Sequence, residues 1–280
     1  MTRIRSTLGL LALAVLPFAA QPAEAQQVYW RGRSGGYDIA WSARDITARR
    51  VSDGALVFSA RRMADAEVAS MQDEHDENVP LKEFERRVRL LSVAGSIISL
   101  EEESYCDCGG AHPILWTRFA SYDVARGSVA NPHPLAATDL VAEAELLRAL
   151  QADRLIRQAM ANAGVRAFTS LRGLVNTLGK HEVRPPNDQC TYGVGERFPS
   201  EFALHHLENG RVALRFSLGH WVEVCRGKLI QLGVLVTPRA RLLPDLNAAN
   251  ARRAGYLMKD VATIAREHET ILNYQPRRGR

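Results

Sequence analysis

Short segments of alternating hydrophobic and polar residues recur along this chain, and alternation with a period of two predicts strands that bury one face. The pattern is clearest at 97–105, where Ile98 and Leu100 alternate with polar residues. Segments 86–93 and 115–123 flank it, so the simplest arrangement is a meander of three antiparallel strands. Other strands are predicted in a hairpin of 38–43 with 55–59, in a hairpin of 202–207 with 212–216, and at 229–237.

Apolar residues at helical spacing predict helices in the remaining segments. The longest helix is expected at 138–163, where Thr138 is suited to cap the first turn and Gly164 follows the last one. The acidic and polar segment 64–78 is open to two interpretations, a short helix or a loop. Two more helices are predicted at 165–180 and 247–272.

Together these elements predict an α+β fold, with antiparallel sheets in two linked lobes and helices packed against them. The chain divides into segments of different character after its first 25 residues. We expect a flexible lead-in at 26–36, an N-terminal lobe at 37–84, an α+β domain at 85–238, a C-terminal helix within 239–274 and a basic tail at 275–280.

The N-terminus is typical of a secretory signal peptide at 1–25. Arg3 and Arg5 precede an apolar stretch at 8–20, and a small-residue site ends at Ala25, after which we expect cleavage. A membrane anchor is the alternative, but the apolar stretch is shorter than the roughly 20 residues of a spanning helix, and Pro17 interrupts it. The sequence therefore predicts a periplasmic or secreted protein without a transmembrane segment in its mature chain.

The chain carries a formal net charge of +5, and part of this excess lies in the basic tail. Nucleic acid is not an expected partner in an extracytoplasmic compartment. An anionic cell-wall polymer or a lipid headgroup is compatible with the sign of the charge.

Four cysteines form an even set, and an oxidising compartment favours their pairing. A bridge between Cys106 and Cys108 would close a very small ring with awkward geometry. We therefore expect each of these two cysteines to pair with Cys190 or Cys225, so that the loop is tied to the C-terminal sheet.

The segment 105–113 has the composition of a built site, because it places two cysteines, a double glycine and a histidine in one loop between predicted strands. His112 either contacts a ligand or hydrogen-bonds the loop's own backbone, and we favour the structural role. Aromatic residues Trp116, Tyr122 and Trp221 offer a platform for stacking on sugars, although aromatics on strands more often belong to the core. The candidate binding residues are Tyr105, Asp107, Gly109, Gly110, His112, Trp116 and Trp221.

Motifs of common hydrolases and phosphate-binding loops do not occur in the chain. Cys106, Cys108 and His112 could ligate zinc with the pair His205-His206, but oxidised cysteines cannot serve as thiolate ligands, so neither a metal nor a cofactor is expected. Within the acidic run 101–103, strand alternation places the middle residue on the face opposite to its neighbours, so adjacent residues cannot form a catalytic pair, and the like charges that share a face are expected to be solvated.

Gly109-Gly110-Ala111-His112, preceded by Tyr105 and followed by a Tyr-Asp turn at 122–127, resembles a domain of unknown function. This family occurs in lysozyme-sensing anti-sigma-factor ectodomains and beside some polysaccharide deacetylases. The later segment 212–238 resembles the closing hairpin of the same family, so the resemblance covers about 37–238. It implies an α+β fold of two linked lobes, a place at the cell envelope and binding of lysozyme rather than catalysis.

These observations predict an exported envelope protein that binds an extracytoplasmic partner without catalysis, the partner being a lysozyme-like protein or peptidoglycan. A glycan-processing hydrolase is the rival hypothesis, with His112 acting beside Asp107 or Asp123. A purely structural envelope protein is the third.

Overall fold

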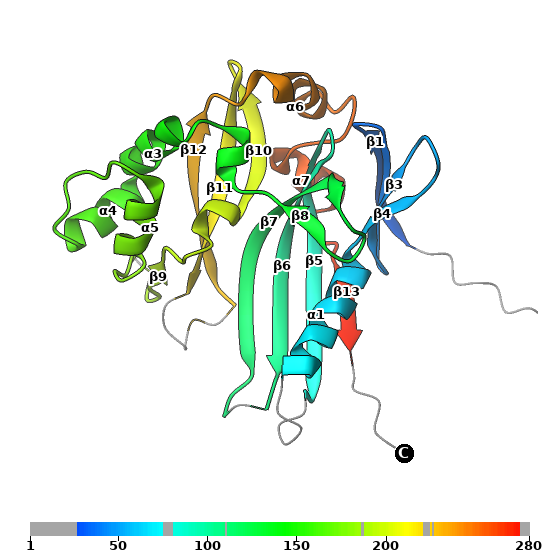
Figure 1. The fold of residues 1–280 in the computed structure, drawn as a ribbon, viewed down its shortest axis with the longest axis horizontal. Coiled ribbons are helices and arrows are strands. Elements are labelled where there is room, and N and C mark those ends of the chain that lie inside the picture. The colour runs from blue at the N-terminus through cyan, green and yellow to red at the C-terminus, as the bar shows by residue number, and fades with distance from the viewer. Residues whose placement is uncertain are drawn as a thin grey trace, which may run out of the picture.

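The computed structural model of this chain describes residues 27–74, 81–109, 111–185, 188–220, 225 and 227–274. It confirms the predicted α+β fold, because antiparallel sheets and short helices follow one another along the chain (Figure 1). The predicted signal peptide and the basic tail lie outside the described residues. Within those residues, the structure contains no helix of the length and apolar character needed to cross a membrane.

The N-terminal sheet consists of β1 (Val28–Ser34), β2 (Tyr37–Ser42), β3 (Ile46–Arg50) and β4 (Leu56–Ser59), paired in that order. The structure corrects two expectations here. The segment 26–36, expected to be a flexible lead-in, contains β1, and β2 pairs with β1 and β3 rather than with 55–59. The strand β1 was missed because arginines occupy its outer positions, while Trp30 supplies a core contact by packing edge-on against Tyr256.

The central sheet confirms the predicted meander of three long antiparallel strands. It contains β5 (Glu83–Ala94), β6 (Ile97–Asp107) and β7 (Ile114–Gly127), extended at its edges by β13 (Thr270–Tyr274) and β8 (Pro132–Pro134). Gly95 joins β5 to β6 with a φ of 61°, a backbone conformation that glycine adopts without steric cost.

The C-terminal sheet confirms the predicted hairpin and the strand that follows it. Its strands are β10 (Phe202–Glu208), β11 (Arg211–His220) and β12 (Leu229–Val236), and the two-residue β9 (Tyr192–Gly193) pairs with the end of β11. Asn209 and Gly210 connect the hairpin with φ values of 49° and 73°. Two consecutive positive φ angles match the twist of antiparallel strands, which explains why Asn-Gly marks this turn in the sequence.

The prediction of one helix at 138–163 is wrong, because the segment forms three short helices separated by two breaks. The backbone of Val141 turns away to bridge Pro238, and the side chain of Asp153 accepts hydrogen bonds from the N–H groups of Leu155 and Ile156, which starts a new helix. Thr138, expected as the cap, lies inside the first short helix. The three helices are α2 (Ala137–Leu140), α3 (Glu143–Ala152) and α4 (Arg154–Asn162).

The helix predicted at 165–180 is shorter, at α5 (Leu171–Leu178), and begins at a Ser170 cap. The helix predicted at 247–272 is wrong. The backbone of Tyr256 exchanges hydrogen bonds of 2.8 and 3.0 Å with Val93, so the chain leaves its helix to reach the central sheet. The segment instead contains α6 (Leu243–Asn250), the 3-10 turn η4 (Met258–Asp260), α7 (Val261–Ala265) and β13, after the 3-10 turn η3 (Ala240–Leu242).

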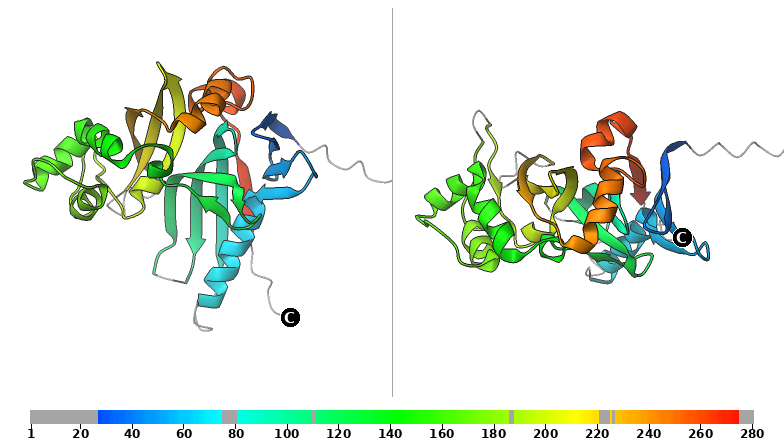
Figure 2. Two further views of the ribbon diagram at one scale, coloured as in Figure 1. Left: turned by 45° about the horizontal axis from the view of Figure 1, so that its top comes forward. Right: turned by 90° about the horizontal axis from the view of Figure 1, so that it is seen from above.

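Two large hydrophobic clusters organise the described residues. One packs α3, α4 and α5 against the C-terminal sheet, and the other joins the N-terminal sheet and α1 (Ala60–Glu74) to one face of the central sheet. The sequence left a short helix or a loop open for the segment 64–78. The structure shows a helix there as far as Glu74. Both views of Figure 2 place the α3–α5 helices and the N-terminal sheet at opposite ends of the molecule.

Candidate binding cleft

The disulfide bonds differ from the expected pairing. Cys106 bonds to Cys108 and Cys190 bonds to Cys225, whereas we expected bridges between these two regions. Residues two apart on an extended strand have Cα atoms about 6.6 Å apart. The chain bends as β6 ends, which shortens the Cα distance between Cys106 and Cys108 to 5.3 Å, well inside the range that a disulfide spans.

The two cysteine regions are nevertheless neighbours. The hydroxyl of Thr117 on β7 donates a hydrogen bond of 3.0 Å to the carbonyl oxygen of Gly227, two residues after Cys225. Gly227 therefore lies against β7 near the tip of the β6–β7 hairpin, although no disulfide joins the two cysteine regions.

The residues of the predicted loop site do not converge on one point. Asp107 accepts a hydrogen bond of 3.3 Å from the N–H of Gly109, whose φ is 79°, and lies 3.5 Å from the ammonium nitrogen of Lys82. His112 is exposed at the tip, while Tyr105 and Trp116 point to opposite faces of the central sheet. The candidates Gly110 and Trp221 lie outside the described residues.

The strand β7 also separates His112 from Asp123. In the pairing of β6 with β7, Ile114 next to the tip pairs with Cys106, and Asp123 pairs with Ile97 near the other end. Nine residues of extended strand span about 30 Å, so these two side chains cannot act on one substrate group.

A cleft of about 850 Å³ opens between α1, β7, β8 and the 3-10 turn η1 (Phe198–Ser200). Trp116 and Arg118 project into it side by side, because residues two apart on a strand point to the same face. Its aromatic and charged lining includes Glu67, Arg86, Trp116, Arg118, Tyr122, Arg197 and Glu201. Of these, the sequence singled out Trp116 and Tyr122.

A buried carboxylate holds the floor of this cleft in place. Glu102 is 1% exposed and pairs across the strands with Arg118, whose Nε and Nη2 atoms lie 3.0 and 2.9 Å from Oε2 of the carboxylate. The hydroxyl of Tyr122 donates a hydrogen bond of 2.9 Å to Oε1. Strand alternation placed this residue on the face opposite to Glu101 and Glu103, and the structure shows that its side chain is buried on that face.

The same network reaches α1 through Arg86. This nearly buried side chain forms an ion pair with Glu67 of α1, and its Nε atom donates a hydrogen bond of 3.2 Å to the hydroxyl of Ser104. The helix is thereby held over the sheet by charge pairing as well as by apolar packing.

The pKa values reflect this network. Burial raises the pKa of Glu102, but the charges of Arg86 and Arg118 and the hydrogen bonds outweigh burial, so the net pKa lies below its ordinary value. Burial and the neighbouring carboxylate raise the pKa of the Tyr122 hydroxyl well above its usual range. Burial also raises the pKa of Glu201, although the charges of Arg118 and Arg197 partly oppose this. The lowered pKa of Glu102 keeps this carboxylate ionised at neutral pH.

The arrangement is suited to recognition. Both oxygens of Glu102 accept hydrogen bonds inside the protein, whereas the side chains of Arg118 and Glu201 remain 21% and 20% exposed at the cleft. Polar groups held at the edge of a concave surface, beside an aromatic ring, orient a ligand by hydrogen bonds and stacking.

Comparison of this chain with protein-family models, with curated proteins and with solved structures finds no match. The resemblance carried by the Gly-Gly-Ala-His loop therefore stays a prediction.

Proposed function

We propose that this chain is an exported, non-catalytic binding module that holds peptidoglycan in the cleft between α1 and β7. The observation that carries the proposal is the placement of Trp116 beside Arg118 on the wall of this cleft. A tryptophan ring offers an apolar face on which a sugar ring can stack, while an arginine donates hydrogen bonds to hydroxyl and carboxylate groups.

The buried polar groups already form hydrogen bonds and ion pairs with one another, which supports binding over catalysis. Glu102 is held by Arg118 and Tyr122 and has a lowered pKa, so it is a poor proton donor at neutral pH. His112 lies outside this cleft, on the hairpin tip. Glu102 and its partners thus hold the charged side chains of the cleft in fixed positions, which suits a ligand that is bound without being cleaved.

A lysozyme-like protein is the second candidate partner, and the exposed hairpin tip favours it. Ile114, at the start of β7, is 55% exposed beside the cysteine loop. An exposed branched apolar side chain next to a rigid, disulfide-closed turn is a suitable anchor for a protein surface. The resemblance to lysozyme-sensing ectodomains points to the same partner.

Sedimentation of the mature protein with purified peptidoglycan sacculi tests the proposal. Trp116→Ala should weaken binding about tenfold, in line with the loss of a buried aromatic anchor. Tyr105→Ala is a matched control, because it removes a half-buried aromatic residue from the opposite face of the same sheet. Equal losses in the two variants, or no sedimentation of the wild type, would contradict a binding site in the cleft.

Two further measurements separate the alternatives. Ile114→Asp should abolish capture by immobilised lysozyme if the partner is a lysozyme-like protein, and it should leave sedimentation with sacculi unchanged. Release of soluble fragments from sacculi by the wild type, lost in a folded His112→Ala variant, would replace the binding proposal with the hydrolase.

A further inference from the structure

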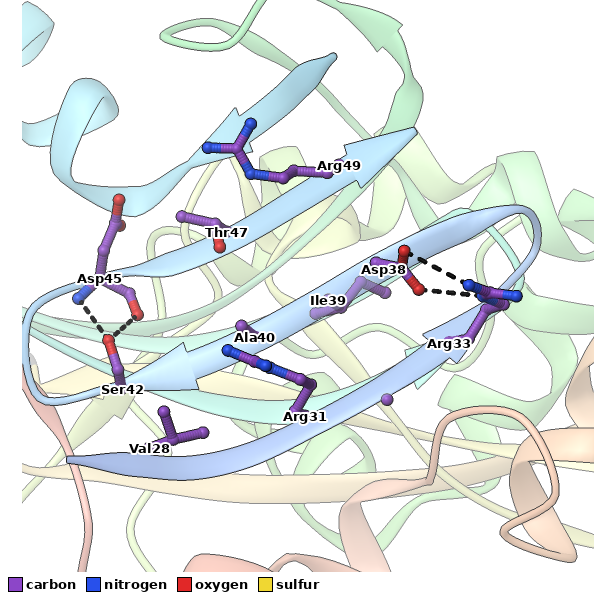
Figure 3. Close-up of a pocket in the computed structure, with 11 residues that line it drawn as sticks. Val28, Arg31, Arg33, Asp38, Ile39, Ala40, Ser42, Asp45, Thr47 and Arg49 are labelled. Atoms are coloured by element: carbon purple, nitrogen blue, oxygen red, sulfur yellow. Dashed lines mark hydrogen bonds and ion pairs between the residues drawn. The ribbon is translucent and has the colours of Figure 1, made fainter. Parts of the chain in front are cut away.

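The N-terminal sheet has a second concave surface, on the face turned away from the core. A hollow of about 810 Å³ lies over β1, β2 and β3 (Figure 3). Ile39 and Trp41 of β2 point inward and are buried, so the residue between them, Ala40, faces the hollow. Together with Thr47 of β3, Ala40 forms a floor of small side chains.

Strand register arranges the charged residues of this face in two adjacent rows. In one row, Arg31 of β1 lies beside Ala40, which lies beside Thr47. In the next row, Arg33 of β1 lies beside Asp38 of β2, which lies beside Arg49 of β3. Figure 3 shows the side chains of Arg31 and Arg49 extending over the same face, on either side of Ala40.

The three arginines differ in how far their charge is already paired. Arg33 lies 2.9 Å from the carboxylate of Asp38, so this pair closes one end of the hollow. Arg49 donates a hydrogen bond of 3.2 Å to the carbonyl oxygen of Gly54, which leaves its charge unpaired. The side chain of Arg31 is exposed and makes no hydrogen bond or ion pair with any described residue. Arg31 and Arg49 therefore flank the small-residue floor without an ion pair of their own. The two carboxylates that line the hollow have other partners: Asp38 pairs with Arg33, and Asp45 accepts hydrogen bonds from the hydroxyl of Ser59 and from the N–H of Arg61.

Protection of an open sheet edge is the ordinary role of charged residues in an outer strand. That role accounts for arginines on β1, which is an edge strand, but it does not account for Arg49 on the inner strand β3. A guanidinium has a planar set of N–H groups that matches carboxylate and phosphate oxygens, so two of them across a floor of Ala40 and Thr47 suit an oxyanion.

We propose that this hollow binds an acidic polysaccharide, whose carboxylates are held by Arg31 and Arg49. From Val28 to Arg33 the hollow follows β1 for about 17 Å, which suits an extended chain better than a compact ligand. A lipid surface fits less well, because stable membrane binding needs buried apolar area in addition to charge, and Val28 is the exposed large hydrophobic residue here. The surface is separate from the cleft, and the inference does not rest on the proposed function.

Titration calorimetry of the mature chain with polygalacturonate tests the inference. Arg31→Ala and Arg49→Ala should each weaken binding roughly tenfold, the size expected for one charge-assisted contact. Arg31→Lys should give an intermediate loss, because it keeps the charge and loses the forked hydrogen bonds. Binding should also weaken as salt is added.

Arg157→Ala is the matched control, since this exposed arginine of α4 lies at the opposite end of the molecule (Figure 2). It should leave the affinity for polygalacturonate unchanged. If Arg31→Ala and Arg157→Ala weaken binding equally, the effect depends on net charge alone, and the proposed site is wrong. The inference also fails if the wild type does not bind polygalacturonate at low salt, or binds vesicles of phosphatidylglycerol equally well through the same arginines.

Discussion

Replacing Glu102 by glutamine should remove the anion that pairs with Arg118 and whose charge also interacts with that of the buried Arg86. The side chains of Glu102 and Arg86 are 1% and 3% exposed, and that of Arg118 is 21% exposed, so water can replace the lost charge only in part. Breaking one partner of a buried ion pair costs about 3 to 5 kcal/mol because the remaining charge is left buried. We expect Glu102→Gln to lower the free energy of unfolding by about that amount.

Two companion variants distinguish the charge from the hydrogen bonds. Tyr122→Phe removes the donor to Oε1 of Glu102 and should cost about 1.5 to 3 kcal/mol, as for one hydrogen bond to a charged group. The double variant Glu102→Leu with Arg118→Met replaces the ion pair by apolar side chains. It should recover a large part of the stability lost in Glu102→Gln, because neither charge of that pair is then buried alone.

The pH dependence of the unfolding free energy is the most direct test of whether Glu102 is ionised in the folded protein. The pKa of Glu102 in the folded protein lies below the value of 4.5 that it has when unpaired, so the unfolded chain takes up its proton first as pH falls. The stability contributed by this carboxylate is therefore present above about pH 4.5 and is lost as pH falls through the lower folded pKa.

Urea denaturation of wild type and Glu102→Gln at several pH values measures this difference. The gap in unfolding free energy should be largest near neutral pH and should narrow below about pH 4. A gap under about 1 kcal/mol at neutral pH, or a gap that stays constant into acid, would refute the view that Glu102 is a buried, ionised partner of the two arginines.

Two other predictions follow from the disulfides and from His205. Peptide mapping without reduction should recover Cys106 with Cys108, and Cys190→Ser should cost about 4 kcal/mol in thermal or urea unfolding, because that bridge closes a loop across a sequence separation of 35. Burial, followed by the charge of Arg215, lowers the pKa of His205 to about 4, whereas the unfolded side chain takes up its proton near 6.5. The wild type should therefore lose stability as pH falls from 6.5 toward 4, and the stability of His205→Gln should depend less steeply on pH over this range.

Local patterns in the sequence predict the strands of this fold better than its helices. The meander β5–β7 and the hairpin β10–β11 follow from period-two alternation and from the turn residues Gly95 and Asn209-Gly210. These signals are contained within a few residues, so the sequence alone carries them.

The helix errors arise where distant backbone groups compete with local spacing. Val141 and Tyr256 both lie in segments with helical periodicity, yet each pairs with the backbone of a residue far away in the chain, Pro238 and Val93. Periodicity cannot show these partners, because it reports which residues are apolar and not which strand edge is left open beside them.

The floor of the cleft was missed for a related reason, although the sequence held a partial signal. At 97–100 both faces of β6 are buried, with Ile98 and Leu100 on one face and Ile97 and Ser99 on the other, so a glutamate further along the same strand need not have a solvent face. A carboxylate on a strand covered on both sides must be paired, and the nearest cations available to it are those on the adjacent strands. Once β6 and β7 are set in antiparallel register from their hairpin, Arg118 falls opposite Glu102. The contribution of Arg86 and of Glu67 on α1 depends on how the helix crosses the sheet, and that packing angle is fixed by tertiary contacts that no local pattern encodes.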